Sequence, residues 1–224
     1  MNIFRFFGDL SHVASIVVLL LRLKAAKSAA GISLKTQELF LLVFVCRYLD
    51  LFTTYYSLYN SLMKVLYLSS TSYIVYMIRY QLPIKATYDR SQDSFLHVKF
   101  AVAPCAVIAF FTTVMWSGFR PLEVRERMIW EFSIWLEAVA IVPQLIVLQR
   151  FGEVENLTAH YVFLMGAYRA LYILNWAYRA NFERGYRHNW VVYIAGVVQT
   201  ALFADFFYYY FLSKYRGGRL SLPS

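Results

Sequence analysis

Apolar runs close to 20 residues long recur along the whole of this 224-residue chain. Each run is long enough to cross the ~30 Å hydrocarbon core of a bilayer as an α-helix. The composition agrees with this reading, because 60% of the residues are hydrophobic and only 16% are charged. A soluble domain is typically about 45–50% apolar and about 25% charged. The chain is therefore predicted to be an all-α membrane protein without a sizeable soluble domain.

Turn and cap residues between the apolar runs divide the chain into seven predicted transmembrane helices. The expected spans are approximately residues 3–22, 36–54, 61–81, 96–116, 129–149, 158–178 and 189–212. Together they form one domain over residues 1–212, followed by a basic tail at 213–224. A weak internal duplication would make spans one to three and spans five to seven two three-helix units joined by the fourth span.

Basic residues in the loops predict the orientation of the chain. A net charge of +9 would suggest nucleic acid as a partner of a soluble protein, but here most of the basic residues lie in short loops that set topology. The first and third loops and the tail hold most of them, so we expect a lumenal N-terminus and a cytosolic C-terminus. The sequon at Asn156 then faces the cytosol and carries no glycan.

The sequence patterns that indicate metal binding, phosphate binding or catalysis are missing from this chain. Cys46 and Cys105 both lie in apolar runs, so neither a disulfide nor a metal framework is expected. The chain has no glycine-rich phosphate loop, no metal-ligand spacing within a span and no serine placed beside a base. We therefore expect no cofactor, no metal and no catalytic residues, and we do not expect an enzyme.

Ionisable residues inside the first two spans are the first candidates for function, because a charge at the bilayer centre costs ~2.5–3.5 kcal/mol. At 100° per residue, Arg5, Asp9 and His12 fall on one stripe of the first span. Arg47 and Asp50 lie about 60° apart, on one face of the second span. The two spans are therefore predicted to turn these residues toward the interior of the bundle.

The last three spans carry a second set of polar and aromatic residues with the same pattern. Glu137 follows Trp130 by seven residues, which is about 20° on a helix. In the sixth span, four residues fall within about 80° of one another and so share one face of the helix: Arg169, Tyr172, Trp176 and Arg179. The last span has one acid, Asp205, that is expected to be buried.

Two readings of the buried charges stay open. Four arginines and four acids could pair with one another and hold the bundle together. Alternatively, the arginines line a polar cavity and bind carboxylates through bidentate hydrogen bonds, with tryptophan and tyrosine as stacking faces. His12 has the same two readings, since it is either a neutral group bonded to a neighbour or a proton switch.

Longer blocks of the sequence resemble a known family. These blocks are MNIFR, GDLSH, CRYLDLF, KATYD, WLEAVAIVPQL, HYVFLMGAYRALYILNW, AGVVQT, DFFYYY and LSLPS. They are similar to blocks of the ER retention receptors, the KDEL/HDEL receptor family, in the same order nearly from end to end. The resemblance implies a seven-helix fold like that of the SWEET sugar transporters.

The resemblance also implies a function and its partners. The chain would bind the C-terminal HDEL- or KDEL-type signal of escaped lumenal proteins in the acidic Golgi and release it in the neutral ER. It would cycle between ER and Golgi membranes with the COPI coat as its cytosolic partner. The implied ligand-binding residues are Arg5, Arg47, Asp50, Trp130, Arg169, Tyr172, Asn175, Trp176 and Arg179. The implied pH switch is His12 with Glu137 and Tyr168, and the implied coat-binding residues are Lys214, Arg216 and Arg219.

One position departs from the family pattern. The family has an acidic residue three positions before the pocket tryptophan, and this chain has Arg127 there. Glu126 or Glu123 could take the place of that acid, so the preference between lysine and histidine at the first ligand position stays open.

A transporter of a small organic anion or sugar with the same fold is the alternative function, because both functions need a cavity. The arginines and the basic tail favour the receptor. Saturable solute uptake in a counterflow assay would favour the transporter.

Overall fold

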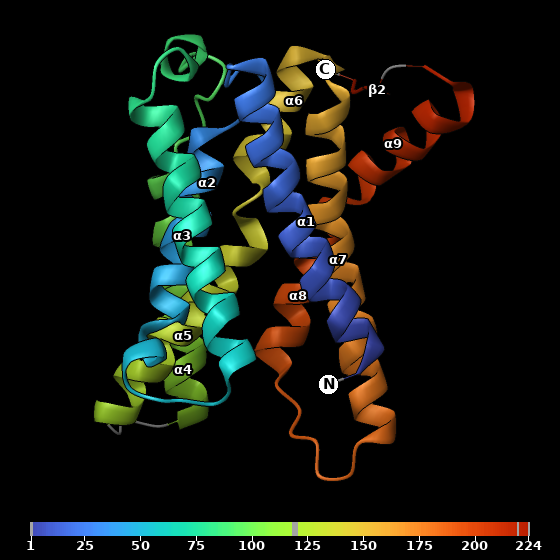
Figure 1. Ribbon diagram of the computed structural model, residues 1–224. Helices are drawn as coiled ribbons and strands as arrows, with labels where there is room; N and C mark the ends of the chain where they lie inside the picture. The colour runs from blue at the N-terminus through green and yellow to red at the C-terminus, as the bar shows by residue number, and fades with distance from the viewer. Residues whose placement is uncertain (1, 118–120, 219, 224) are drawn as a thin grey trace.

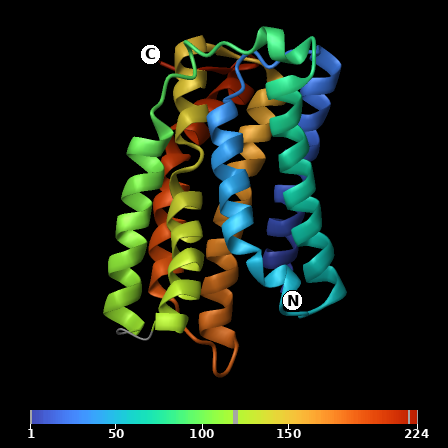
Figure 2. The same cartoon turned by 90° about the vertical axis from the view of Figure 1, so that its left-hand side faces the viewer.

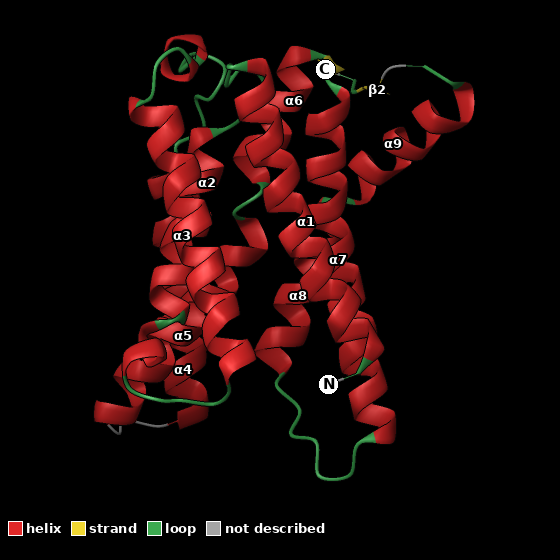
Figure 3. Ribbon diagram, in the orientation of Figure 1, coloured by secondary structure: helices red, strands yellow, loops and turns green. Residues whose placement is uncertain are grey.

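Helices make up almost all of the computed structural model, which describes residues 2–117, 121–218 and 220–223 (Figure 3). For residues 116, 117 and 121–124, only the backbone is described. The α-helices are α1 (Ile3–Ala26), α2 (Leu34–Arg47), α3 (Leu58–Tyr80), α4 (Ala103–Ser117), α5 (Pro121–Val139), α6 (Val142–Phe151), α7 (Asn156–Phe182), α8 (Trp190–Leu202) and α9 (Ala204–Arg216). Short 3-10 turns cover Leu49–Phe52 and Ile84–Thr87, a π-helical turn covers Val98–Val102, and the two strands are β1 (Glu153–Val154) and β2 (Leu220–Ser221).

The helices except α9 run roughly along one long axis and pack as two groups, and α9 leans away from them (Figures 1 and 2). In one group α2 packs on α3 and α5, and α4 packs on α5. In the other, α1 packs along α7, and α7 also packs on α8. Contacts between α5 and α8 join the two groups. We call the end with the N-terminus, the loop after α2 and the start of α5 the cavity end, and the end with β1 and β2 the strand end (Figure 1).

Among the described residues, three helical stretches are long and apolar enough to cross a membrane: Ile3–Ala26, Val98–Met115 and Arg125–Phe151. The pair α8 and α9, bent by 41° at Phe203, would be a fourth if it counts as one span. The chain is therefore an all-α membrane protein. The count of seven spans and the arrangement as two three-helix units remain predictions.

Local side-chain bonds explain where several helices begin. Asn2, Ser33, Ser57 and Asn189 each precede a helix, and each side-chain oxygen accepts a hydrogen bond from a backbone N–H of the first turn. Such caps satisfy donors that have no partner inside the helix. The caps place the starts of α2 and α3 at Leu34 and Leu58, close to the predicted starts at residues 36 and 61, whereas α2 ends at Arg47 instead of residue 54 and α5 starts at Pro121 instead of residue 129.

The fifth predicted span is broken where α5 ends and α6 begins. Pro143 sits in the first turn of α6 and has no N–H to donate. The Gln144 side chain donates to the Gly31 carbonyl (2.7 Å) and accepts from the Ser33 N–H (2.8 Å), and the Gln144 N–H donates to Thr36 Oγ1 (2.9 Å). The break is therefore fixed against the start of α2.

Close approach of α1 to α7 depends on a glycine. A Cβ added to Gly8 would lie 2.9 Å from a ring carbon of Tyr172. Such a distance is not tolerated between real atoms, so glycine here lets the two helices meet and brings the stripe of α1 against α7.

Candidate functional site

The carboxylate of Glu137 lies at the centre of a buried charge cluster. Glu137 is on α5 and is only 3% exposed. It accepts hydrogen bonds from Arg47 of α2 and from the Tyr168 hydroxyl of α7 (2.8 Å), and Arg169 Nη2 lies 2.5 Å away. A buried carboxylate is stable only when its charge is compensated. One acid and two arginines give this cluster a net positive charge, which favours an anionic ligand nearby.

Arg47, the last residue of α2, connects the cluster to a cavity. Its Nε donates to Ser133 Oγ (3.1 Å), its Nη2 donates to the Ser133 carbonyl (2.8 Å), and its Nη1 donates to Glu137. These bonds use three of the five N–H donors of a guanidinium. Arg47 also lines the cavity, so the Glu137 cluster and the cavity wall meet at this residue.

The cavity itself measures about 790 Å³ and lies at the cavity end of the bundle. Its wall comes from the end of α2 and the turn after it, the start of α3 and the start of α5. The lining includes Arg47, Asp50, Asn60, Lys64, Glu126 and Trp130. A volume of this size is typical of small-molecule sites. Of the four arginines predicted to line a polar cavity, this wall contains Arg47.

Asp50 is placed differently from the helical-face prediction. α2 ends at Arg47, and Asp50 lies in the 3-10 turn that follows. The 60° angle to Arg47 therefore does not apply, because it assumed a continuous α-helix. Both side chains still line the cavity. Asp50 Oδ2 pairs with Lys64 Nζ at 2.7 Å, whereas Oδ1 is buried and has no hydrogen-bond partner among the described residues.

The acid near the pocket tryptophan is Glu126. Glu126 and Trp130 both line the cavity, whereas Arg127 faces the loop before α8 and lines a separate pocket of about 160 Å³. Arg127 Nε also pairs with Glu131 at 2.8 Å. The side chain of Glu123 lies outside the described residues. With Arg127 turned to the other pocket, the neighbouring position supplies Glu126 to the cavity wall, which also contains Asp50.

His12 is enclosed by aromatic rings. It stacks on Tyr67 and on Tyr168, with ring centroids 4.5 and 4.2 Å apart and interplanar angles of 25° and 8°. Tyr168 is also the residue that donates to Glu137. The predicted switch residues His12, Glu137 and Tyr168 are therefore in one chain of contacts from α1 through α7 to α5.

Arg5 and Asp9 share the face of α1 that packs on α7, as the stripe predicts. Arg5 Nε lies 4.0 Å from Asp9 Oδ2, and the Arg5 side chain is 43% exposed. Asp9 also accepts hydrogen bonds from Tyr172 of α7 and from Tyr59 of α3 (2.8 Å). Near the end of the same face, Asn2 Nδ2 donates to Asn175 Oδ1 at 2.7 Å. Arg5 is thus held beside an acid but keeps an accessible guanidinium.

Arg169 is buried and only partly bonded. Its Nη2 contacts both Glu137 and the Tyr168 hydroxyl (3.2 Å). Its Nε is buried without a hydrogen-bond partner among the described residues. An unsatisfied buried donor is costly, so Arg169 fits the prediction of an additional anchor for acidic groups.

Two predicted ligand residues lie apart from this cluster. Arg179 pairs with Glu183 of its own helix at 2.7 Å, and both side chains are accessible. The Trp176 ring packs on α8, where a Cβ at Gly196 would lie 2.5 Å from it, and it lines an apolar pocket with Tyr193. This structure therefore does not bring Arg179 and Trp176 together with Arg47 and Glu137.

The prediction of a buried acid in the last span is wrong. Asp205 is exposed and lies in the first turn of α9, immediately after the break at Phe203. Because the span is bent there, the residue does not continue the inward face of α8. The buried polar group on α8 is instead Gln199, whose side-chain amide donates to the Tyr168 hydroxyl at 3.2 Å.

The basic residues predicted to bind a coat lie at the strand end. Lys214 and Arg216 are in the last turn of α9, with Lys214 Nζ 5.6 Å from the Tyr210 ring. Arg219 lies outside the described residues. After α9, the chain turns back and β2 pairs antiparallel with β1, and the Leu222 N–H donates to the Gly152 carbonyl at 3.1 Å. The tail predicted at 213–224 thus begins as helix and ends docked on the loop after α6.

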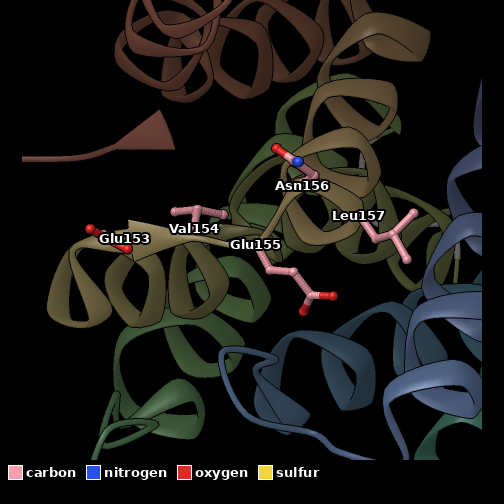
Figure 4. A pocket seen from close by; sticks show the side chains of 5 residues that line it. All are labelled: Glu153, Val154, Glu155, Asn156 and Leu157. Carbon is pink, nitrogen blue, oxygen red and sulfur yellow. The ribbon is translucent and has the colours of Figure 1, made fainter. Parts of the chain in front are cut away.

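A second cavity of about 500 Å³ lies at the strand end, around the start of α7 (Figure 4). It is lined by residues 153–157, including Glu153 and Glu155, and Glu155 pairs with Arg22 of α1 at 2.8 Å. Its lining has no cluster of arginines comparable to the one beside the first cavity. The first cavity is therefore the candidate site for an anionic ligand.

Comparison with known proteins identifies the family of the chain. Residues 28–179 match the family model described as ER lumen protein retaining receptor. Over its full length the chain is 51% identical to the ER lumen protein-retaining receptor of Petunia hybrida and 50% identical to the ER lumen protein-retaining receptor 2 of Homo sapiens, with both relatives covered completely. It is 46% identical to the receptor of the same name from Plasmodium falciparum, with 98% of that relative covered.

The chain belongs to the ER lumen protein retaining receptor family.

Several residues of this receptor's site were missed by the helical-face analysis. Ser133 holds Arg47, Gln199 holds Tyr168, and Tyr59 and Tyr67 contact Asp9 and His12. These are ordinary residues within apolar helices, and nothing in the sequence separates them from residues that face lipid. Lys64 is different, since a lysine just inside an apolar run is itself a signal of a buried charge partner.

Proposed function

We propose that this receptor binds the C-terminal HDEL- or KDEL-type tetrapeptide of escaped ER lumenal proteins in the acidic Golgi and releases it at neutral pH in the ER. The supporting observation is Arg47, a guanidinium held by α5 at the wall of a cavity of about 790 Å³ with donors left over. A planar guanidinium matches a carboxylate through two parallel hydrogen bonds. In this proposal Arg47 binds the terminal carboxylate.

The acidic ligand residues and the basic first residue need different partners. Arg169 supplies a buried N–H without a partner, and Arg5 supplies an accessible guanidinium. Asp50 and Trp130 lie in the same cavity wall as Arg47 and supply an acid and an aromatic face for the first residue. We assign Tyr172, Asn175, Trp176 and Arg179 to the remainder of the ligand path, which requires α7 and α8 to approach the ligand more closely than here.

The dependence on pH follows from linkage. An anionic peptide beside the cluster favours a protonated His12, so binding takes up a proton. By linkage, affinity then rises as pH falls through the titration range of histidine. The hydrogen bond of 2.8 Å between Tyr168 and Glu137 connects α5 to α7 next to His12. In this proposal it stabilises the ligand-bound arrangement.

Return to the ER requires a cytosolic signal. We assign this role to Lys214, Arg216 and Arg219 with the COPI coat as the partner, which places the N-terminus in the lumen and the tail in the cytosol. The cavity end is then lumenal. Retrograde traffic from Golgi to ER completes the proposed cycle.

The deciding experiment is binding of a short peptide that ends in HDEL to the purified receptor. The free-acid peptide is compared with the same peptide carrying a terminal amide, at mildly acidic and neutral pH. We expect the free acid to bind at least about tenfold more tightly than the amide and more tightly at acidic pH. Equal affinities for the two peptides would overturn the proposal.

A further inference from the structure

The acid proposed to receive the ligand's first residue already has a cationic partner within the chain. Lys64, in the second turn of α3, is 8% exposed, and its Nζ lies 2.7 Å from Asp50 Oδ2. The ammonium also lies 5.9 Å from the centroid of the Tyr48 ring and 5.4 Å from that of Tyr56. Aromatic faces at these distances stabilise a cation. Lys64 is therefore held in the position that an external ammonium would take.

Only one of the two carboxylate oxygens of Asp50 takes part in this ion pair. Its Oδ1 atom is buried and has no hydrogen-bond partner among the described residues. Asp50 and Lys64 line the same cavity as Arg47 and Trp130. A ligand group that enters the cavity thus meets a carboxylate with one oxygen paired to Lys64 and the other shielded, together with one fixed positive charge.

We propose that Lys64 is a resident competitor for Asp50 and thereby sets how strongly the receptor discriminates the first residue of its ligand. This inference rests on the proposed function. An incoming ammonium has to displace Lys64 or share Asp50 with it, and two like charges beside one carboxylate repel each other. A first residue without a compact full positive charge avoids this repulsion. Lys64 therefore weakens the preference for a lysine at the first position.

The prediction is a change in a ratio of affinities. Peptides ending in KDEL and ADEL differ only in the charged first side chain, so their affinity ratio reports on the environment of Asp50. In Lys64→Met, the carboxylate of Asp50 has lost its resident partner. We expect the KDEL-to-ADEL ratio to rise at least about tenfold over wild type, with the affinity for ADEL changed less than about twofold.

Three further variants make the test specific. Lys64→Arg keeps the charge and is expected to keep the wild-type ratio. Lys85→Met removes an exposed lysine of the 3-10 turn after α3, which does not line the cavity, and serves as the matched control without effect. Lys64→Gln repeats the neutral substitution with a polar side chain, so that the test survives if Lys64→Met does not fold.

The outcomes separate this inference from the proposed function. If wild type does not distinguish a free from an amidated terminus, the proposed function fails. If wild type makes this distinction but the KDEL-to-ADEL ratio stays the same or falls in both neutral variants, only the role of Lys64 is overturned. A ratio that rises equally in Lys64→Arg would also overturn it, because the charge would then not be the cause.

Discussion

Arg22 and Arg47 lie at opposite ends of the bundle, each near the C-terminal end of its helix, and they differ in how their donors are used. Arg22 donates from Nε to Thr158 Oγ1 (3.3 Å), from Nη1 to the Ser28 carbonyl and from Nη2 to the Ala30 carbonyl (2.7 Å). Its Nη2 also pairs with Glu155. All three nitrogens are therefore bonded, and their partners lie in the loop after α1 and at the start of α7.

Arg47 has a smaller and shared set of partners. It bonds to Ser133 and to Glu137, and Glu137 is also the partner of Arg169. Two arginines thus compete for one carboxylate beside a cavity. Both Arg22 and Arg47 are largely shielded from solvent, so burial alone does not distinguish them. Their surroundings do, because all three nitrogens are bonded in each of them: the partners of Arg22 tie the loop after α1 to the start of α7, whereas Arg47 shares Glu137 with Arg169 and lines a cavity that can admit a ligand.

Arg47→Ala is expected to have the largest effect of the changes that test this comparison. Loss of a charge-assisted bond in a shielded site costs ~1.5–3 kcal/mol or more. We therefore expect affinity for a peptide ending in HDEL to fall at least about 100-fold in a folded protein, measured by calorimetry. The matched control is Arg79→Ala, which removes an arginine paired with Glu38 in an accessible position. Wild-type affinity in folded Arg47→Ala would refute the assignment.

Arg22→Ala tests the other half of the comparison. Removing one partner of a buried polar network leaves carbonyls and a carboxylate without a donor. The free energy of unfolding is expected to fall by about 2–4 kcal/mol, seen as a lower Tm in detergent. Peptide affinity in the folded fraction should stay within about twofold of wild type. Loss of binding at an unchanged Tm would show that the two arginines do not differ as described.

The His12→Ala substitution tests whether His12, near the cavity end, is the proton switch. If binding takes up one proton, the affinity of wild type for the HDEL peptide is expected to rise about tenfold for each unit by which the pH falls across the titration range of histidine. In His12→Ala this rise should shrink to less than about twofold. His160→Ala is the control, because His160 lies toward the strand end and bonds to Tyr210 at 2.8 Å. An acid dependence as steep as in wild type would assign the sensor to another group.

Changes in the tail should have the smallest effect on binding. Replacing Lys214, Arg216 and Arg219 together leaves the cavity end untouched, so HDEL affinity should match wild type. The variant is expected to stay in the Golgi when excess ligand is expressed, as seen by fluorescence microscopy. Redistribution to the ER would show that the tail is not the retrieval signal. The matched control replaces three other exposed basic residues of the chain, namely Lys24, Lys27 and Lys85.

Sequence reasoning works best where a helix is continuous. Arg5, Asp9 and His12 were placed on one stripe of α1 that faces the interior of the bundle, and in the structure Asp9 and His12 of this stripe are buried. It fails where a helix stops or bends. The predicted helical angle between Arg47 and Asp50 does not apply, because α2 ends at Arg47 and Asp50 lies in the 3-10 turn that follows. The sequence predicts a buried Asp205 because it has no proline or glycine at Phe203, where the helix breaks, and so gives no sign that α8 ends there.

Pairings between helices are the part that the sequence does not determine. The chain offers several partners of each sign, and the choice of Glu137 by both Arg47 and Arg169 depends on how α2, α5 and α7 come together. The same is true of Lys64 with Asp50, since one lies on α3 and the other in the turn after α2. Helical periodicity gives the face of one helix and carries no information on its neighbour.

The break between α5 and α6 restricts which movements the receptor can make. Ala140 and Ile141 are fully buried, and the Gln144 bonds to Gly31, Ser33 and Thr36 replace part of the helical bonding lost there. Irregular backbone is tolerated at membrane depth only where protein covers it, since each unpaired group in lipid costs several kcal/mol. The start of α2 and the start of α6 therefore have to travel as one rigid piece. A hinge that served the ligand cycle would have to lie elsewhere, because opening this one would expose the peptide groups to hydrocarbon.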